Sequence, residues 1–363
     1  MRRCWYMDSA DLIAHETLTL SRPLVHTGDL RNVTIRLAAD FVPFPTEGAA
    51  PLRWCVYMKD PNGAKVENVQ ILGHPDPTYL PRWNDTADLS PGIPAGLGGM
   101  LMHRATGCTV RGVKVTGLPG VAVQLNGATM CGVSDVVTDR TLMGLRIGPD
   151  QTSNNVIVDR VTVGDTWEPL LPGYSGKGQS LKYPGARTGG VCFAAANTTM
   201  LTLRDVVTVW GSEGKGIKLN SMKWAFVADC QVPGLQVQGE WAGDPPGQTS
   251  HGIAIQGCSI KRKRTYRETE PTDANGIHIH GGATSVWVKD STIESDGGGG
   301  MGIWNDASEV NVTGCKIGGW NGERGGRLGH AIAAVNCGVI QNLATVEADN
   351  TFDNQDRLVL VEP

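Results

Sequence analysis

A four-residue motif recurs along this chain at a spacing that a stacked fold would produce. Each copy begins with Val or Leu, ends with Val, Cys or Ser, and carries an Asp or Gly between these two ends. The copies occupy 110–113, 133–136, 158–161, 203–206, 227–230, 288–291 and 312–315. The marker Asp or Gly falls at positions 112, 135, 159, 205, 229, 290 and 314, and a further copy is placed at 257, giving gaps of 23, 24, 46, 24, 28, 33 and 24 residues. A repeat of about 23 residues with insertions predicts a solenoid built coil by coil.

A second recurring segment precedes these markers. Alternating apolar and polar residues occur at 144–147, 190–193, 216–219, 276–279 and 302–304. Alternation with a period of two indicates β-strands whose aliphatic side chains face inward. The composition, with 48 Gly against 5 Phe and 6 Tyr, suits tight turns around a narrow core. Each repeat is therefore predicted to carry at least two very short strands.

Two of these repeats, GIHIHGGATSVWVKDSTI and GLRIGPDQTSNNVIVDRVTV, carry a family resemblance. Over residues 17–348 the chain resembles the right-handed parallel β-helix proteins of the pectate-lyase-like superfamily. The resemblance implies an all-β fold, a right-handed single-stranded parallel β-helix with coils of about 23 residues and loop insertions along one side. Polysaccharide lyases, glycoside hydrolases, epimerases, adhesins and phage tailspikes share this fold, so it leaves the activity open.

The expected domain organisation is a single solenoid. A solenoid grows by adding coils, so 363 residues do not require a second domain. We expect an N-terminal cap at 1–16, the parallel β-helix at 17–348, and a C-terminal tail or cap at 349–363.

Charge and hydropathy exclude several partners. The formal net charge is −4, which provides no global basic field for a nucleic acid. No apolar run approaches the roughly 18 residues of a membrane span. The first residues, MRRCWYMDSADLIAH, lack the apolar segment of a conventional signal peptide. The sequence therefore predicts a soluble protein without nucleic-acid partners or membrane insertion.

The cysteines are predicted to be core residues. Nine Cys is an odd number, and no CxxC motif is present. Cys108 and Cys131 lie 23 residues apart, at equivalent positions of adjacent coils, and Cys230, Cys258 and Cys315 follow their markers. Free Cys is commonly buried, so we expect stacked reduced thiols rather than disulfides or a zinc site.

Several insertions interrupt the regular coils and are predicted to form a groove. They span 74–99, 166–188, 240–250, 261–273, 296–300 and 318–329, and long loops in a compact protein are usually functional or disordered. If the later insertions flank one column of strands, they form the walls of a groove and that column forms its floor.

The strand alternation predicts which residues line this floor. The expected outward, solvent-facing residues are Ala122, Gln124, Arg146, Cys192, Lys218, Asn220, Gln236, Gln238, His278, His280, Trp304 and Asp306. Neighbouring strands lie about 4.8 Å apart. Lys218, Gln236, His278 and Trp304 are therefore expected to form one ridge about 15 Å long, which matches about three sugar rings.

Two chemistries are open for a catalytic floor. Cleavage of a uronic polysaccharide by elimination needs a base and cations near the acidic proton, and Lys218, Arg146, His278 and His280 supply such groups. Hydrolysis needs two carboxylates, and Asp306 would be one, with Asp296, Glu240 or Asp244 as its partner. The predicted catalytic residues are Lys218, His278, His280 and Asp306. The alternative is that they are ordinary residues of a sheet surface.

The predicted substrate-binding residues combine the floor with aromatic residues of the loops. They are Arg146, Asn220, Gln236, Gln238, Trp304, Trp167, Tyr183 and Trp241. Aromatic side chains on loops suit stacking against sugar rings, although they also serve to pin their own loops. No metal site is predicted, because His278 and His280 have no third ligand fixed by spacing. No cofactor is expected, with calcium in the acidic loops left open.

The function that these features favour is a tailspike-like protein of a phage virion. It would bind a surface polysaccharide, with cleavage as a further step, and would assemble as a homotrimer with other tail proteins. The expected location is the virion or the extracellular space after cytosolic assembly, with the cytoplasm as the alternative. The rival functions are a free-standing polysaccharide lyase, glycoside hydrolase or epimerase, and a non-enzymatic structural or adhesive virion protein.

Overall fold

The structure is a computed structural model built from short parallel strands. It describes residues 12–13, 15, 17–41, 54–73, 97–148, 151–164, 193–208, 216–239, 249–262, 275–295, 299–304, 306–318, 330–335, 340–353 and 359–362. These residues contain β-strands and turns but no helix, which confirms the all-β class, and none of them forms a helix that could span a membrane. Two compact units, Met1–Phe193 and Ala194–Pro363, are described separately below as unit 1 and unit 2.

Unit 1 contains three columns of parallel strands, in which each strand pairs with its equivalent in the next coil. The first column contains β3 (Leu24–His26), β6 (Trp54–Lys59), β9 (Gly98–His103) and the last residues of β11 (Lys114–Asn126) and β12 (Thr129–Ile147). The second contains β1 (Leu12–Ile13), β4 (Leu30–Arg31), β7 (Lys65–Glu67), β10 (Thr109–Arg111), the start of β12 and the start of β13 (Ser153–Val163). The third contains β2 (Thr17–Leu20), β5 (Thr34–Leu37), β8 (Gln70–Leu72), the start of β11 and the middle of β12.

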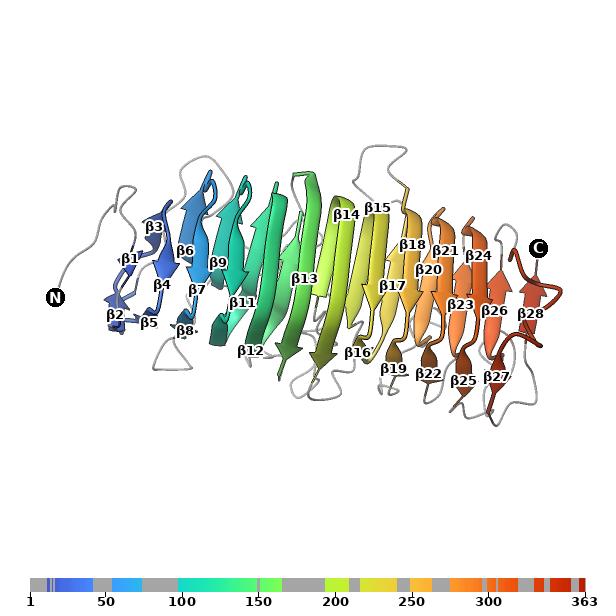
Figure 1. Cartoon of the computed structure of the whole chain (residues 1–363). Coiled ribbons are helices and arrows are strands. Elements are labelled where there is room, and N and C mark those ends of the chain that lie inside the picture. Colours follow the sequence, from blue (N-terminus) through green and yellow to red (C-terminus); the bar gives the residue numbers. More distant parts are fainter. Residues whose placement is uncertain are drawn as a thin grey trace, which may run out of the picture. The chain divides into compact units, whose positions relative to one another are not determined.

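Unit 2 repeats this arrangement (Figure 1). Its first column contains the start of β15 (Ile217–Ala228), then β17 (Leu235–Gln238), β20 (Ile277–His280), β23 (Met301–Trp304), β26 (Ile332–Val335) and β28 (Val359–Glu362). The second contains the end of β15, β18 (His251–Gln256), β21 (Thr284–Lys289) and β24 (Ser308–Thr313). The third contains the end of β14 (Phe193–Thr208), β16 (Gln231–Val232), β19 (Ser259–Arg262), β22 (Thr292–Ser295), β25 (Lys316–Gly318) and β27 (Thr351–Phe352).

The core of unit 2 is a stack of aliphatic side chains from successive coils. In the first column the inward residues are at most 1% exposed, and they are Ile217, Leu219, Leu235, Val237, Ile277, Ile279, Met301 and Ile303. Each lies opposite its equivalent in the next coil, for example Ile277 opposite Met301. Burial of apolar surface stabilises the folded state by about 25 cal/mol per Å², and each coil buries its apolar side chains against the coils on either side of it. The stability of each coil therefore depends on its neighbours. The predicted inward position of the aliphatic residues in this column is confirmed.

The recurring Asp or Gly has a conformational cause. At the marker positions the backbone has positive φ, with values of 65° at Gly112, 55° at Asp135, 54° at Asp229 and 50° at Asp290. Gly and Asp tolerate this left-handed conformation better than most residues do. The marker predicted at Asp159 is wrong by one position. Ser134 pairs with Asp159, so the left-handed residue of that coil is Arg160, with a φ of 54°, and the Asp159 marker is incorrect.

The cysteines within the described ranges are buried free thiols, as predicted. The described free thiols are Cys55, Cys108, Cys131, Cys230, Cys258 and Cys315. Several donate to the carbonyl oxygen two residues earlier, as Cys258 does to Gln256 at 3.4 Å and Cys315 to Thr313 at 3.4 Å. Burial raises the pKa of the Cys315 thiol to about 11, so this thiol stays protonated near neutral pH.

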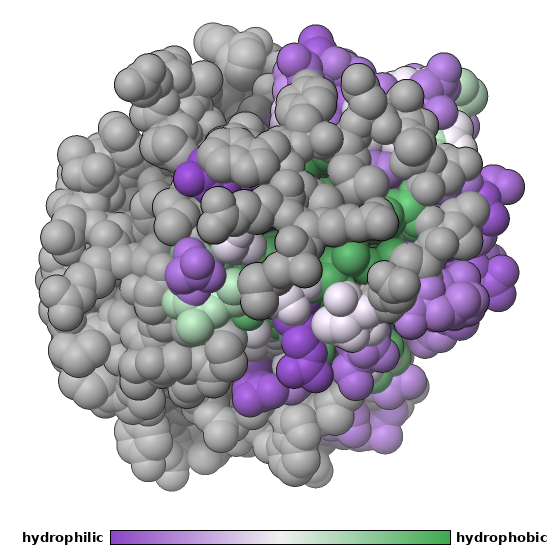
Figure 2. Space-filling model, turned by 90° about the vertical axis from the view of Figure 1, so that its left-hand side faces the viewer, coloured by the Kyte–Doolittle hydropathy of each residue, from purple (hydrophilic) through white to green (hydrophobic). Residues whose placement is uncertain are grey.

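Figure 2 views the side of the structure on the left of Figure 1. Among the coloured residues of the visible face, apolar residues lie towards the middle and hydrophilic residues lie mainly along the right-hand side. This distribution fits strands that direct aliphatic side chains inward and polar side chains to the surface.

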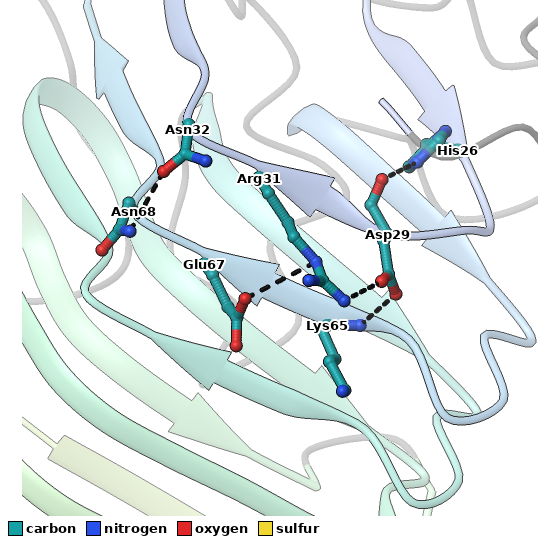
Figure 3. A network of polar contacts seen from close by, with 7 residues as sticks. All are labelled: His26, Asp29, Arg31, Asn32, Lys65, Glu67 and Asn68. Carbon is teal, nitrogen blue, oxygen red and sulfur yellow. Dashed lines mark hydrogen bonds and ion pairs between the residues drawn. The ribbon is translucent and has the colours of Figure 1, made fainter. Parts of the chain in front are cut away.

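A polar network in unit 1 joins two successive coils (Figure 3). Nε2 of His26 donates to the carbonyl oxygen of Asp29 at 2.9 Å, and Oδ1 of Asp29 accepts a hydrogen bond from the backbone N–H of Lys65 at 2.8 Å. Arg31 forms an ion pair with Asp29 and a second one with Glu67 at 3.5 Å. The carboxylate of Asp29 therefore ties its own turn to the next coil.

The ionisation of Asp29 should make stability depend on pH. Desolvation opposes ionisation, but the Lys65 amide and the Arg31 guanidinium outweigh it and lower the pKa of Asp29. A lowered folded-state pKa contributes stability above the unfolded value, about 3.9, that is lost as pH falls through the folded-state value. We expect Asp29→Asn to reduce the free energy of unfolding by about 1–3 kcal/mol at pH 7. The difference from the parent protein should shrink as urea melts are repeated below pH 4, and a pH-independent difference would contradict this assignment.

Candidate functional site

The outward side chains of the first column of unit 2 form two polar rows, which we call the polar face. Lys218, Gln236 and His278 occupy equivalent positions on β15, β17 and β20. Two residues further along each strand, Asn220, Gln238 and His280 form the second row. The structure thus brings together six side chains from segments far apart in the sequence. Figure 1 shows β17, β20 and β23 side by side.

The position of Trp304 differs from the prediction. The expected ridge of Lys218, Gln236, His278 and Trp304 is incorrect, because His278 pairs with Gly302. Trp304 lies two residues later and belongs to the second row. The indole of Trp304 nevertheless points back towards the first row. A β-carbon built on Gly302, which stands in the first row, would lie only 2.1 Å from Nε1 of Trp304. Gly302 therefore provides the space that the indole occupies.

The polar face is less exposed than the sequence predicted. His278 is only 7% exposed, Gln236 2% and Trp304 5%, whereas Lys218, Gln238 and His280 are half-buried. The expectation that all of these side chains are solvent-facing is therefore wrong for the first three residues, and also for Asn220, which is 8% exposed. Neighbouring strands lie about 4.8 Å apart, so long polar and aromatic side chains on one face cover each other.

The histidines of β20 pack against each other and against Trp304. The rings of His278 and His280 stack, with centroids 4.2 Å apart and an interplanar angle of 12°. Trp304 meets His278 edge to face, with centroids 6.3 Å apart and an angle of 90°. Nε2 of Gln236 lies 2.5 Å from Nε2 of His280 and 3.2 Å from Oε1 of Gln238. If the amide donates to His280, the neutral imidazole carries its proton on Nδ1.

Three buried amide atoms around this cluster have no hydrogen-bond partner among the described residues. They are Oδ1 of Asn220, Oε1 of Gln236 and Nδ2 of Asn275. Their residues are 8%, 2% and 5% exposed, respectively. A buried polar atom without a partner costs about 1–3 kcal/mol, so a ligand that satisfied these atoms would recover that free energy.

The remaining predicted floor residues lie elsewhere. Strand β23 ends at Trp304, and Asp306 is an exposed turn residue with a φ of 63°, so its expected place on the same strand is incorrect. Arg146 belongs to unit 1, where it pairs with Gln124 and is half-buried. Gln124 and Ala122 are 6% and 0% exposed, which contradicts their expected exposure.

Unit 1 has a smaller polar contact on its own first column. The hydroxyl of Tyr57 lies 3.2 Å from Nδ1 of His103. Desolvation, and then the charge of Asp60, raise the pKa of Tyr57. The phenol therefore remains neutral over a wider pH range than a solvated tyrosine does.

Other predictions fall on residues that the structure does not describe. The loop aromatics Trp167, Tyr183 and Trp241 lie outside the described residues, as do Cys192, Glu240, Asp244 and Asp296. Within the described ranges, no three or more His, Cys, Asp or Glu residues group as metal ligands would.

The sequence patterns did not indicate two residues of this cluster, Asn275 and Gly302. Asn275 precedes β20, and its Nδ2 would lie 2.2 Å from a β-carbon on Gly302. The prediction treated Gly302 only as the start of an alternating segment. Segments 276–279 and 302–304 both begin with Gly-Ile, so their alignment by sequence places Gly302 opposite Gly276, and the observed pairing of Gly302 with His278 differs from it by two residues.

Comparison with known proteins decides the family. The family described as "Right handed beta helix region" matches residues 98–317, which is more than half of the chain. The chain belongs to the right-handed β-helix family. This match confirms the predicted fold and its handedness. A search of curated proteins found no match.

Solved structures with the same fold include viral and enzymatic proteins. The Dettilon tailspike protein is 10% identical with a TM-score of 0.50, over 95% of this chain and 62% of that protein. The tailspike protein of Pseudomonas phage LKA1 is 10% identical with a TM-score of 0.48, over 87% and 62%. An alginate lyase from Paenibacillus is 9% identical with a TM-score of 0.37, over 95% and 90%. This β-helix protein thus spans about three fifths of the two tailspike chains, and the likeness shows the fold alone.

Proposed function

We propose that this β-helix protein binds a polysaccharide along the polar face of unit 2. The observation that carries the proposal is the cluster of buried amides, stacked histidines and an edge-on tryptophan on adjacent coils. Sugars combine hydroxyl groups with apolar ring faces, so sites that bind them combine amide and imidazole groups with aromatic rings. The strand spacing of about 4.8 Å repeats these groups along one direction, as a chain of sugars requires.

The biological setting that we propose is a tailspike-like role on a phage virion. The protein would act outside the host cell, assemble as a homotrimer and attach to other tail proteins. Support comes from the shared fold of the two tailspike proteins and from a polar face suited to surface glycans. Multi-angle light scattering of the purified full chain distinguishes a trimer from a monomer, and a monomer would favour a free-standing polysaccharide enzyme.

Cleavage of the bound polysaccharide is the second candidate function. The stacked pair His278 and His280 favours it, because imidazoles titrate near neutral pH and act as general acids and bases. Hydrolysis by two carboxylates has less support in the described residues. Asp306 lies in an exposed turn, and its candidate partners Glu240, Asp244 and Asp296 are outside the described residues.

A glycan panel tests the binding proposal and the cleavage candidate together. Neutral and acidic polysaccharides are assayed for binding by calorimetry, for new reducing ends and for ultraviolet absorbance of unsaturated products. Binding without products supports the binding role, and either product type identifies the cleavage chemistry. If no polysaccharide binds to the folded full chain, the proposal fails.

Substitution of the half-buried residues tests which surface binds. We expect His280→Ala together with Lys218→Ala to weaken glycan binding at least tenfold, since each removes a charge-assisted or neutral hydrogen bond worth about 0.5–3 kcal/mol. The melting temperature should fall only modestly, because neither side chain belongs to the aliphatic core and Nε2 of Gln236 keeps Oε1 of Gln238 as its acceptor when His280 is removed. His251→Ala is the matched control, because His251 lies in the second column, edge to face with Trp224. Equal losses in both variants would contradict the assignment of the polar face.

A further inference from the structure

The second column of unit 2 exposes large aromatic side chains. Trp224 and Phe226 on β15 are 55% and 38% exposed, and Trp287 on β21 is 38% exposed. Phe226 lies opposite Ala254 of β18, and Ala254 lies opposite Trp287. Phe226 and Trp287 therefore stand two strand spacings apart, about 9.6 Å. We call Trp224, Phe226, Ala254 and Trp287 the aromatic strip.

The backbone conformation of Trp224 keeps its indole on this surface. Its φ is 61°, a left-handed value that bulky residues rarely adopt. A β-carbon built on Gly252 would lie 2.5 Å from Cε3 of the indole, so the ring covers the backbone of the next coil. Such unfavourable conformations persist mainly where a side chain has a function. Because Trp224 is more than half exposed, that function is not burial in the core.

The aromatic strip has an apolar centre and a charged border. In the row that starts at Phe226, the residue between it and Trp287 is Ala254, which adds only a methyl group. Lys223 and Lys289 are exposed at the border of the strip. An aromatic centre with charged residues at its rim is the composition of a protein–protein contact. A sugar site also needs polar groups close to its aromatic rings, and here that place is taken by an alanine.

We infer that the aromatic strip is the surface through which copies of this chain pack side by side. The row from Phe226 to Trp287 runs across the strands, in the direction in which the coils of unit 2 stack. A partner that covers it therefore extends in the same direction. A second copy of the chain meets this requirement, because its coils repeat at the same spacing of about 4.8 Å.

The size of the strip also favours a second copy. Its four residues are far fewer than the roughly 20–30 that each partner contributes to a standard interface. A stable contact therefore needs further exposed apolar residues on the same column. Met200, 24 residues before Trp224, has a φ of 58° and is 46% exposed. In unit 1 the second column exposes Met130 on β12 and Ile157 on β13.

This inference rests on the homotrimer of the proposed function and names the surface that would hold it together. The polar face belongs to the first column of unit 2, whereas the strip belongs to the second. Association and glycan binding are therefore assigned to different surfaces, and each can be removed without the other.

Light scattering of the full chain over a range of concentrations tests the inference. We expect the double variant Phe226→Glu with Trp287→Glu to raise the dissociation constant of the oligomer at least tenfold, because it places charges in an apolar contact. Leu343→Glu is the matched control, since Leu343 is 44% exposed but lies in a turn between β26 and β27. It should associate as the parent does. A folded parent chain that stays monomeric, or a double variant that associates like the parent, would overturn the inference.

Hydroxyl-radical footprinting provides a readout that needs no variant. Oxidation of Trp224 and Trp287 in the parent protein is compared between the oligomer and the diluted chain, with Leu343 as the internal reference. We expect oxidation of both tryptophans to be at least about threefold slower in the oligomer, because the centre of a contact excludes solvent. Equal oxidation in the two samples would contradict the assignment of the strip.

Calorimetry with a short glycan that binds the parent separates this inference from the proposed function. The double variant should bind the glycan as tightly as the parent does. A loss of glycan affinity with unchanged association would make the strip a sugar-stacking surface and overturn the inference. Association through the strip in a parent chain that binds no glycan would support the inference and contradict the proposed function.

Discussion

Replacing Ile277 with Asp is expected to abolish soluble folding. Ile277 is fully buried in the core of unit 2, where Leu235 lies opposite it on one side and Met301 on the other. An unpaired charge at this position loses its hydration and also separates two coils that stabilise each other. The expected cost is several kcal/mol, comparable with a typical total stability of about 5–15 kcal/mol.

The measurement is the soluble fraction after expression, followed by a thermal melt of any soluble protein. Gln256→Asp is the control, because Gln256 is exposed and lies opposite Lys289 in the next coil. It introduces the same side chain into a strand of the same unit without burying it. A soluble Ile277→Asp variant with a cooperative melt would mean that the inward and outward faces are exchanged.

Replacing Gly302 with Ala is expected to weaken glycan binding at least tenfold, with a smaller effect on folding. The new methyl group would lie 2.1 Å from Nε1 of Trp304 and 2.2 Å from Nδ2 of Asn275, which is closer than nonbonded atoms approach. Both side chains must move, and the edge-to-face contact with His278 moves with them. We expect at least a tenfold loss of affinity. Each hydrogen bond to the glycan that is lost contributes about 0.5–1.5 kcal/mol to binding, and the contact of the Trp304 ring contributes a similar amount.

A second glycine provides the control for this variant. Gly132 also lies within a strand, and a β-carbon there would have no heavy atom within 4 Å. Gly132→Ala should therefore retain both the affinity and the melting temperature of the parent protein. Unchanged glycan affinity in Gly302→Ala would show that the arrangement of Trp304 and Asn275 does not matter for binding.

The sequence was sufficient to predict the fold, because the same coil recurs along the chain. Aliphatic residues at alternate positions, as in Ile277 and Ile279, determine which side of a strand faces the core. Markers such as Asp229 and Gly112 reveal the left-handed turn of each coil, because few residue types adopt positive φ without strain. Both signals are local in sequence, so they could be recognised without knowing which strands are neighbours.

The candidate site depended on contacts between coils, which local patterns do not fix. Gly302, not Trp304, lies opposite His278, and only the pairing of β20 with β23 shows that the indole occupies the space above that glycine. The burial of Gln236 and His278 arises from side chains on adjacent strands, so alternation alone overestimated their exposure. Asn275 joins the cluster from outside any strand, where no periodicity applies. The sequence thus determined the repeating coil and its inward face through local backbone and hydropathy preferences. Tertiary structure decided which outward side chains meet, because that depends on register and on packing between segments far apart in the chain.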